Sequence, residues 1–572
     1  MSSADAGVFN QSVQGAAEMK LVIVGGVAGG ASAATRARRL AEDAQIVLVE
    51  RGPDVSFANC GLPYYLGGEI TDRNKLLIVT PERMASRYKL DVRVRSNVEA
   101  IDRQRKVVRI RDLATGREYE ESYDKLILSP GAAPLRPPIP GIDSPGVHTL
   151  RNLQDMDRIM AALDNGVRRA VVVGAGFIGL ELVENFVRRG VAVTLVELQD
   201  QVMPPLDREM TTPIEKALAD EGVTLLLGDS AEAFASGDSG LTVQLKSGAA
   251  IAADLVVLGI GVRPENKLAV DAGLEVGPRG GIRVDEHLRT TDPDIYAVGD
   301  AIEVKNFISG GPTQIPLAGP ANRQGRAAAD NIFGRPTSYR GTQGTAVVGV
   351  FELTAAMTGA SEKVLQRGGR PYHKIYVHPA HHAGYYPGAE QMTLKLLFEP
   401  ETGKLLGAQA IGRGGVDKRI DVIAVAIQAG MTVFDLEEME LAYAPQYGSA
   451  KDPVNMAGFV AAGLLRGDHP QIDVMELQAS PEHERPWLLD VRTAKEFQAG
   501  CIPGATNIPV DELRSRLEEL PRDRHIAVYC QVGQRGYLAT RILMQAGFQV
   551  ANVAGGYKTY TMFQPSREPA GV

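Results

Sequence analysis

The sequence contains little cysteine and lacks any long uncharged apolar run. Its 572 residues include three cysteines, Cys60, Cys501 and Cys530, which are too few and too scattered for a disulfide framework or a zinc knuckle. No uncharged apolar run reaches the roughly 18 residues that a membrane span needs, and the first residues lack the basic and apolar regions of a signal peptide. We therefore expect a cytoplasmic protein without a metal site, in which each cysteine is a possible reactive thiol.

An excess of basic residues is also absent. The formal net charge of -8 gives no electrostatic footprint for nucleic acid or for an anionic membrane surface, so we expect neither as a partner. The composition, 44% hydrophobic and 23% charged, is typical of a soluble globular protein. The chain is too long for one core, and its length predicts about three to five domains of roughly 100 to 200 residues each.

The segment 20–50, KLVIVGGVAGGASAATRARRLAEDAQIVLVE, has the pattern of a buried strand, a glycine-rich turn, a helix and a second strand. In such a βαβ unit the helix N-terminus offers free N–H groups to a pyrophosphate, and a carboxylate at the end of the second strand, here Glu50, accepts hydrogen bonds from ribose hydroxyls. Gly25 and Gly30 fit the dinucleotide pattern, but Val27 stands where a second glycine is usual. This turn alone does not distinguish nucleotide binding from a tight turn.

The same pattern recurs in segment 170–197, AVVVGAGFIGLELVENFVRRGVAVTLVE. Here Gly174, Gly176 and Gly179 are all in place, and Glu197 ends the second strand. A carboxylate at this position would repel the 2′-phosphate of NADPH, and the next two residues supply no arginine to bind it, so we predict NADH as the ligand. Two dinucleotide units, the second one intact, predict a flavin in the first and a nicotinamide in the second.

Three later segments complete the pattern: DKLILSPGAAP at 124–134, DLVVLGIGVRP at 254–264 and TTDPDIYAVGDA at 290–301. With them the chain resembles the pyridine nucleotide-disulfide oxidoreductase family over residues 20 to about 455. The resemblance implies FAD, NADH and a redox-active cysteine beside the isoalloxazine ring. It also implies that FAD is bound by Gly25, Gly30, Glu50, Gly131 and Asp300, with Asp300 at the ribityl and phosphate end.

Cys60 lies in SFANCGLPYYLGG. Members of the family that reduce disulfides such as glutathione's carry CxxxxC here, but the position five after Cys60 is Tyr65. Without a partner in this segment, Cys60 would cycle through a sulfenic acid or through a mixed disulfide with an external thiol. Because the segment predicts a helix N-terminus beside a flavin, we expect the pKa of this thiol to lie below its free value of about 8.5.

The external thiol is indicated by SFANCGLPYY together with LAYAPQYGSAKDPVN further along. These resemble the coenzyme A-disulfide reductase branch of the family more than its NADH oxidases and peroxidases. The resemblance implies a coenzyme A groove with Ser56 and Asn59 at the pantetheine end and Arg36 and Arg39 at the phosphates. The second subunit of a homodimer would contribute Tyr385, Tyr443 and Lys451. A tyrosine hydroxyl could protonate the departing thiolate, or these aromatic residues could simply pack in an interface.

The C-terminal segments LLDVRTAKEFQAGCIPGATNIP and HIAVYCQVGQRGYLATRILMQAGF resemble a rhodanese domain. Cys530 is expected to end a strand, with N–H groups of the following loop pointing at its sulfur and stabilising a thiolate or persulfide; the alternative is a buried strand-end cysteine. The loop residues are Gln531, Val532, Gly533, Gln534 and Arg535. Cys501 stands where rhodaneses usually have histidine, and we expect packing as its role, with a catalytic or resolving role as the alternative.

The predicted fold is α/β, with two Rossmann-like dinucleotide-binding domains for FAD and NADH, an α+β dimerisation domain that contains a hairpin, TLKLLFEPETGKLLGAQAIG, and a C-terminal α/β rhodanese domain. The predicted boundaries are an N-terminal extension at 1–18, FAD-binding parts at 19–145 and 266–340, an NADH-binding domain at 146–265, a dimerisation domain at 341–460, a linker at 461–480 and a rhodanese domain at 481–572.

The resulting hypothesis is an FAD enzyme that uses NADH to reduce a coenzyme A-linked persulfide, polysulfide or disulfide through Cys60, with sulfane sulfur carried on Cys530. A plain coenzyme A-disulfide reductase with an independent sulfurtransferase domain is one alternative. An NADH oxidase or peroxidase is a second, and a redox-sensing interaction protein is a third.

Overall fold

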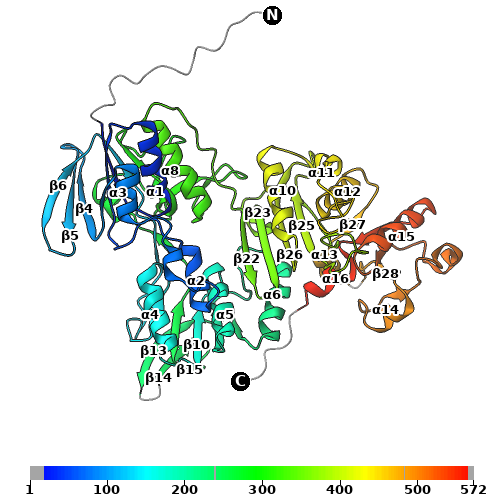
Figure 1. Cartoon of the computed structure of the whole chain (residues 1–572). Coiled ribbons are helices and arrows are strands. Elements are labelled where there is room, and N and C mark those ends of the chain that lie inside the picture. Colours follow the sequence, from blue (N-terminus) through cyan, green and yellow to red (C-terminus); the bar gives the residue numbers. More distant parts are fainter. Residues whose placement is uncertain (1–18, 238–239, 482, 565–572) are drawn as a thin grey trace, which may run out of the picture.

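The computed structural model describes residues 19–237, 240–481 and 483–564. Figure 1 shows two α/β domains, a third domain built around an antiparallel sheet, and a fourth domain at the C-terminal end. The predicted extension at 1–18 lies outside the described residues. Within them, no helix is both long enough and apolar enough to cross a membrane.

The first domain has a parallel sheet in the order β19-β7-β1-β2-β3. Helices α1 and α8 pack against each other, and a Cβ on Gly325 of α8 would lie 2.1 Å from the Gly29 carbonyl oxygen of α1. Glycine is therefore required where the two helix backbones meet. The strands and helices are β1 Lys20–Val24, α1 Ala28–Leu40, β2 Gln45–Val49, α2 Leu62–Gly67, α3 Pro81–Tyr88, β3 Asp91–Arg93, β7 Lys125–Leu128, β19 Ile295–Ala297 and α8 Ala318–Ile332, with an antiparallel sheet of β4 Ser96–Asp102, β5 Val107–Asp112 and β6 Glu118–Ser122.

The second domain repeats this architecture, with a parallel sheet in the order β12-β11-β10-β16-β9. Both predicted βαβ units are confirmed, because β1 pairs in parallel with β2 and β10 pairs in parallel with β11. Strands that are apolar throughout can be buried on both faces of such a sheet. The elements are β9 Val147–Thr149, α4 Leu153–Asp164, β10 Arg169–Val173, α5 Phe177–Arg188, β11 Ala192–Glu197, α6 Arg208–Asp220, β12 Thr224–Leu227 and β16 Leu255–Leu258, with an antiparallel sheet of β13 Ala231–Gly237, β14 Gly240–Leu245 and β15 Ala250–Ala253.

The third domain is an antiparallel sheet in the order β22-β23-β26-β25-β24. The predicted hairpin is present as β25 paired with β26, and every residue of both strands is buried. Helices α10 and α12 pack on this sheet (Figure 1). The elements are β22 Ala346–Val350, β23 Leu353–Gly359, α9 Glu362–Arg367, β24 His373–Val377, β25 Thr393–Phe398, β26 Leu405–Gly412, α10 Val416–Gln428, α11 Val433–Glu438 and α12 Pro453–Leu465.

The C-terminal domain has a parallel sheet in the order β27-β31-β30-β28-β29. Since α12 ends at Leu465 and β27 already belongs to this sheet, the two domains are joined by residues 466–470 alone. The elements are β27 Gln471–Ile472, α13 Val474–Ala479, β28 Trp487–Asp490, α14 Ala494–Gln498, β29 Thr506–Asn507, β30 Ile526–Tyr529, α15 Gln534–Gln545, β31 Val550–Val553 and α16 Gly556–Met562.

Candidate functional site

The first glycine-rich turn connects β1 to α1. Gly25 has a φ of +95°, and a Cβ there would lie 2.1 Å from the Ser129 carbonyl oxygen. A Cβ on Gly30 would lie 1.8 Å from the Gly25 carbonyl oxygen. Glycine is therefore required at both positions to bring the N-terminus of α1 against the strand ends. Val27, which stands where a glycine is usual, is the N-cap residue of α1.

The second turn, between β10 and α5, has the same construction. Gly174 has a φ of +103°, and a Cβ on Gly179 would lie 1.9 Å from the Gly174 carbonyl oxygen. Gly176, the N-cap residue of α5, has open space around it, because a Cβ there would meet no atom within 4 Å. That open space at a helix N-terminus is what a pyrophosphate requires.

The two acidic residues at the strand ends also hold the turns themselves. The Gly26 N–H donates to Glu50 Oε2 at 2.8 Å, and the Ala175 N–H donates to Glu197 Oε2 at 2.7 Å. Each second carboxylate oxygen accepts from a backbone N–H two residues further on, at 2.7 Å for Glu50 and 2.9 Å for Glu197. Each carboxylate is thereby oriented at the carboxyl end of its sheet, where a ribose would lie.

A third region, around Asp300, fits the flavin end of a dinucleotide. Asp300 lies in the turn Gly299–Ala301 after β19, and the Gly299 N–H donates to Gln324 of α8 at 2.8 Å. Burial raises the pKa of Asp300, while the guanidinium of Arg151 opposes that rise. Gly131, after β7, has a φ of +75°. Gly131, Gly299 with a φ of +79°, the half-buried Asp300 and the first glycine-rich turn therefore offer a cradle and polar groups of the kind that FAD requires.

Cys60 is held at the edge of this cradle. It lies in the turn Asn59–Gly61 immediately before α2, and its side chain is exposed. The Ser56 N–H donates to the Gly26 carbonyl at 2.9 Å, and the Asn59 amide donates to the Arg151 carbonyl at 3.1 Å. Ser56 also has a φ of +46°, a backbone conformation that is costly for a residue with a side chain and is found preferentially at functional sites. The Ser56 bond attaches the cysteine segment to the first nucleotide turn, and the Asn59 bond attaches it to the segment that precedes α4.

The expectation of a lowered thiol pKa is not met, because desolvation of Cys60, and then the negative charges of Glu181 and Asp300, raise its pKa. Glu181 comes from α5 of the second domain, and burial raises its own pKa to about 7. Its carboxylate accepts a hydrogen bond of 3.3 Å from the Tyr64 hydroxyl of α2. Glu181 was not predicted from the sequence; its signal there is an acidic residue inside the apolar helix FIGLELVENF.

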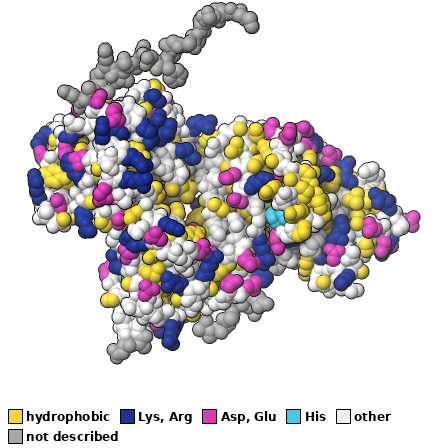
Figure 2. Space-filling model, viewed as in Figure 1, with side chains coloured by type: hydrophobic (Ala, Val, Ile, Leu, Met, Phe, Trp, Pro, Cys, Tyr) yellow, Lys and Arg dark blue, Asp and Glu magenta, His cyan; other side chains and the backbone are white. Residues whose placement is uncertain are grey.

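A basic cavity of about 280 Å³ lies between α1 and α8. It is lined by Ser32, Thr35, Arg39, Asn322, Arg323 and Arg326. Figure 2 shows lysine and arginine side chains gathered over this part of the molecule. Arg39, which the resemblance assigned to a phosphate, lines this cavity, whereas Arg36, assigned with it, forms a largely buried ion pair with Asp330, with Nε 2.7 Å from Oδ1. Arg323 and Arg326 were missed because α8 is far from α1 in the sequence.

The tyrosines assigned to the coenzyme A groove lie in the third domain. The hydroxyls of Tyr385 and Tyr443 are 2.8 Å apart, and this hydrogen bond raises the pKa of Tyr385. Their side chains are 76% and 48% exposed, and Lys451 is also exposed. In the described part of the chain, no hydrogen bond links these tyrosines to the Cys60 segment. The structure therefore brings the tyrosines together on a surface, available to a second subunit.

Cys530 directly follows β30 and is buried. The Gly533 N–H donates to its sulfur at 3.2 Å, and Gly533, with a φ of +98°, is the N-cap residue of α15. Arg535 binds Glu496 with two hydrogen bonds of 2.6 and 2.8 Å, which lower the pKa of Glu496 to about 2. The loop thus presents a backbone donor and the N-terminus of a helix to the sulfur. Cys501 is partly exposed.

The C-terminal domain is docked on the remainder of the chain through buried polar contacts. His378, just after β24, has Nδ1 2.9 Å from the Thr393 hydroxyl and Nε2 2.8 Å from the Thr559 hydroxyl of α16. Burial lowers the pKa of His378 to about 3, so this imidazole is neutral. The Thr212 hydroxyl of α6 donates to the Met562 carbonyl at 2.7 Å.

The loop of Cys530 is also linked to the loop that carries Tyr385. The Lys558 N–H of α16 donates to the Gln531 carbonyl at 3.0 Å. The Lys558 ammonium donates to the Gln391 side chain at 3.2 Å. Gln391 pairs with Ala380 in an isolated β-bridge at the base of the loop that carries Tyr385. The sulfur loop therefore lies on the side of the C-terminal domain that meets the third domain.

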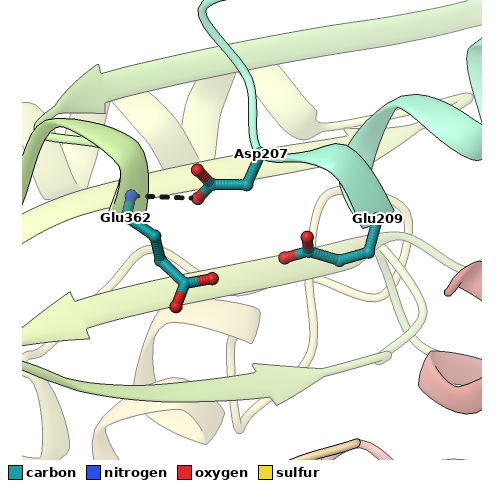
Figure 3. Close-up of side chains that lie close together, drawn as sticks. All are labelled: Asp207, Glu209 and Glu362. Carbon is teal, nitrogen blue, oxygen red and sulfur yellow. Dashed lines mark hydrogen bonds between the residues drawn. The ribbon is translucent and has the colours of Figure 1, made fainter. Parts of the chain in front are cut away.

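Three carboxylates converge at the junction of the domains, as Figure 3 shows for Asp207, Glu209 and Glu362. Their oxygens lie within 4.8 Å of one another, a spacing that could hold a metal ion. However, the ammonium of Lys395, which is 0% exposed, contacts all three carboxylates, with Nζ 2.8 Å from Asp207 and 2.5 Å from Glu362. This lysine supplies the positive charge that a metal ion would otherwise supply, so the arrangement is a buried ion-pair network.

The network reaches the C-terminal domain through Lys374 of β24. Its ammonium lies 3.0 Å from Glu362 and 3.0 Å from Asp473, the N-cap residue of α13. Burial alone would raise the pKa of Glu362, but the ammonium groups of Lys395 and Lys374 lower this pKa to about 2. This network was not predicted from the sequence; its clearest local signal there is a lysine inside the buried strand TLKLLF.

Three family models match the chain. Residues 19–325 match the pyridine nucleotide-disulphide oxidoreductase model, residues 345–452 match the dimerisation domain of that family, and residues 473–562 match the rhodanese-like domain.

The chain is similar to proteins of known name along most of its length. A coenzyme A disulfide reductase of Staphylococcus aureus (strain JH9) is 36% identical over 444 residues, which are 77% of this chain and 99% of that protein. The crystal structure of reduced CoADR-RHD from Bacillus anthracis shares 51% identity with a TM-score of 0.93, covering 95% of this chain and 98% of that one. An NAD-dependent persulfide reductase from A. fulgidus shares 38% identity with a TM-score of 0.89, covering 95% and 100%.

Proposed function

Because the chain belongs to the pyridine nucleotide-disulphide oxidoreductase family and carries a C-terminal rhodanese-like domain, we propose that it is an NADH-dependent FAD enzyme that reduces a coenzyme A-linked persulfide, polysulfide or disulfide. Catalysis uses Cys60, and Cys530 carries the sulfane sulfur. The observation that carries this proposal is the pairing of a solitary exposed thiol at the first nucleotide turn with a second thiol under a helix N-terminus in a docked domain.

The residues of the two glycine-rich turns bind and orient the dinucleotides. Gly25, Gly30, Glu50, Gly131 and Asp300 would hold FAD. The NADH site consists of Gly174, Gly176, Gly179 and Glu197. FAD, when bound, supplies hydride transfer from NADH and transfer of the electron pair onward to sulfur.

Cys60 supplies the nucleophile. Its thiolate attacks the coenzyme A sulfur of a persulfide, forming a mixed disulfide with coenzyme A and releasing hydrosulfide as the S–S bond breaks. Two electrons that derive from NADH, together with one proton, then return the mixed disulfide to the Cys60 thiolate and free coenzyme A. Over the cycle, NADH and coenzyme A persulfide give NAD⁺, coenzyme A and hydrosulfide. With coenzyme A disulfide as substrate, the leaving group is a second coenzyme A thiolate.

Coenzyme A itself would lie along the surface from the basic cavity to Cys60. Arg39, Arg323 and Arg326 provide positive charge for its phosphates. Ser56 and Asn59 lie on the segment that carries Cys60 and would contact the pantetheine end. In a homodimer, the exposed tyrosine pair and Lys451 would close the groove from the second subunit. The Tyr385 hydroxyl, held by Tyr443 at 2.8 Å, would then donate a proton to the departing thiolate.

Cys530 would collect the sulfur. Its thiolate attacks a sulfane donor to form a persulfide, and a coenzyme A thiolate then takes the outer sulfur and regenerates Cys530. The docking contacts at His378 and Lys558 support this transfer of sulfur to coenzyme A, because they hold the sulfur loop on the side that meets the third domain. A plain coenzyme A-disulfide reductase with an independent sulfurtransferase is favoured by the Staphylococcus relative, which matches 77% of this chain.

Steady-state NADH oxidation with coenzyme A persulfide and with coenzyme A disulfide tests the proposal. We expect turnover of the persulfide to be lost in Cys60→Ser. With a sulfane donor plus coenzyme A as the source, turnover should also be lost in Cys530→Ser. Faster turnover of the disulfide, unchanged by Cys530→Ser, would favour the plain reductase. Rapid oxygen consumption without any sulfur compound would indicate an oxidase, and very slow turnover with a protein partner bound in one redox state would indicate a sensor.

A further inference from the structure

His469 lies in the short segment that joins the third domain to the C-terminal domain. It follows α12 and precedes β27, and its side chain is buried although it lies outside both elements. Its N–H donates to the Gly463 carbonyl near the end of α12 at 3.0 Å. Its ring packs against Tyr537 of α15, with centroids 4.5 Å apart. One residue therefore contacts both the final helix of the third domain and the helix that follows the sulfur loop.

The imidazole of His469 is bonded to a side chain that supports the sulfur loop. Asn552, in β31, donates one N–H of its amide to His469 Nε2 at 2.9 Å and another to the Gly533 carbonyl at 3.1 Å. The Gly533 N–H in turn donates to the Cys530 sulfur at 3.2 Å. The contacts thus lead from His469 through Asn552 to the Gly533 carbonyl and, across the Cα of that residue, to the N–H that donates to the sulfur.

Only one form of His469 permits this arrangement. Since Asn552 is the donor, Nε2 must carry the lone pair, which places the ring proton on Nδ1. Burial, followed by the positive charge of Arg541, lowers the pKa of His469 to about 4, so the ring is neutral near pH 7. A neutral ring with a fixed tautomer is a permanent acceptor, which fixes the rotation of the Asn552 amide and leaves its other N–H aimed at Gly533.

The geometry points to His469 as a positioning residue for the sulfur site: by accepting from Asn552 it fixes the carbonyl of Gly533, and thereby the N–H of the same residue, which donates to Cys530. His469 does not touch the sulfur, so its effect is transmitted through the loop. The positioning itself is independent of the reaction that Cys530 performs. Its consequence for sulfur transfer rests on the proposed function.

Two substitutions separate the acceptor of His469 from its packing. His469→Phe keeps a ring against Tyr537 but removes the acceptor. His469→Gln loses the ring but places an amide oxygen near the position of Nε2. A histidine in the first domain, His287, provides the matched control, because its ring contacts the Thr337 carbonyl and lies outside this chain of hydrogen bonds.

The first measurement is hydrogen–deuterium exchange of the full-length FAD-loaded protein, followed by mass spectrometry of a peptide that covers residues 530–536. Loss of one buried hydrogen bond should speed exchange of this loop roughly two- to tenfold in His469→Phe. His469→Gln and the control His287→Phe should exchange like the wild type. Unchanged exchange in His469→Phe, or equal acceleration in Phe and Gln variants, would overturn the proposal.

Asn552→Ala supplies a second route if His469→Phe does not yield folded protein. It should speed exchange of the same loop at least as much, and His469→Leu, which also removes the acceptor, should add nothing in that background, because both changes break one chain of contacts. Independent, additive effects would count against the proposal.

Sulfur loading gives a separate readout. With thiosulfate as the probe, the Cys530 thiolate takes the sulfane sulfur and sulfite leaves; the persulfide is followed by mass spectrometry. We expect slower loading in His469→Phe and recovery in His469→Gln. If wild-type Cys530 acquires no sulfur, the sulfur-carrier part of the proposed function fails, while the exchange measurement still decides the role of His469.

Discussion

Lys395→Met should strongly destabilise the protein, because it removes the cation at the centre of the buried network. Asp207, Glu209 and Glu362 would then face one another within 4.8 Å without their shared ammonium. Breaking a buried ion pair on one side typically costs about 3 to 5 kcal/mol. The fall in the pKa of Glu362 from its usual 4.5 to about 2, to which Lys395 and Lys374 both contribute against the effect of burial, corresponds to roughly 3 kcal/mol, which is of the same order.

The pH dependence of the stability provides a second, independent test of this prediction. In the wild type, the lowered pKa of Glu362 contributes stability that is present above pH 4.5 and is lost as the pH falls toward about 2. In Lys395→Met, Glu362 is buried without the central cation, so its pKa rises and its protonation relieves the repulsion among the three carboxylates. The difference in stability between the variant and the wild type should therefore shrink as the pH is lowered from about 8 to about 5.

Differential scanning calorimetry of the FAD-loaded protein measures both effects. A loss of about 3 kcal/mol should lower the Tm of the transition that contains the third domain by roughly 6 to 12 °C. Lys216→Met is the matched control, because Lys216 pairs with Asp220 on the exposed face of α6 and exposed pairs contribute little. A Tm within about 2 °C of the wild type at pH 7, or a penalty that grows on acidification, would refute this account.

Four further substitutions test the thiol, the nucleotide site and the coenzyme A site. Glu181→Gln should speed alkylation of Cys60 by iodoacetamide more at pH 8 than at pH 6. The reason is that Glu181, whose pKa is about 7, is mostly charged at pH 8 and mostly neutral at pH 6. Equal alkylation rates for the variant and the wild type at pH 8 would contradict this. Gly179→Ala should abolish NADH binding, because its Cβ would lie 1.9 Å from the Gly174 carbonyl oxygen. The Cβ of Gly176→Ala would meet no atom within 4 Å, so this variant should keep the thermal unfolding profile of the wild type and only weaken NADH binding. Arg326→Gln should raise the Kd for coenzyme A in calorimetric titration, with a smaller effect at high salt.

The two nucleotide folds could be predicted from sequence because their signals are local. An apolar strand, a glycine-rich turn and an amphipathic helix lie within about 30 consecutive residues of a βαβ unit, and the structure confirms both units at 20–49 and 169–197. The hairpin of β25 and β26 is equally local. The end of β30 at Tyr529, just before Cys530, follows from the same kind of pattern.

The electrostatic environment of Cys60 could not be obtained in this way. Its position before a short helix predicted a lowered pKa, whereas its pKa is raised by burial and by Glu181, a residue of the other nucleotide domain. Local sequence describes the helix that follows the thiol but not the charges that tertiary packing brings against it. The same reason explains why Arg323 and Arg326 were missed in the basic cavity.

The sequence by itself determined the order of the domains, the two dinucleotide units and the absence of a cysteine partner in the segment around Cys60, because each depends on residues close together in the chain. Tertiary structure alone decided that Lys395 neutralises three carboxylates, that His378 fixes the C-terminal domain, and that His469 supports the sulfur loop. These contacts join residues from distant segments, and their free energies depend on burial and distance, which exist only after the chain has folded.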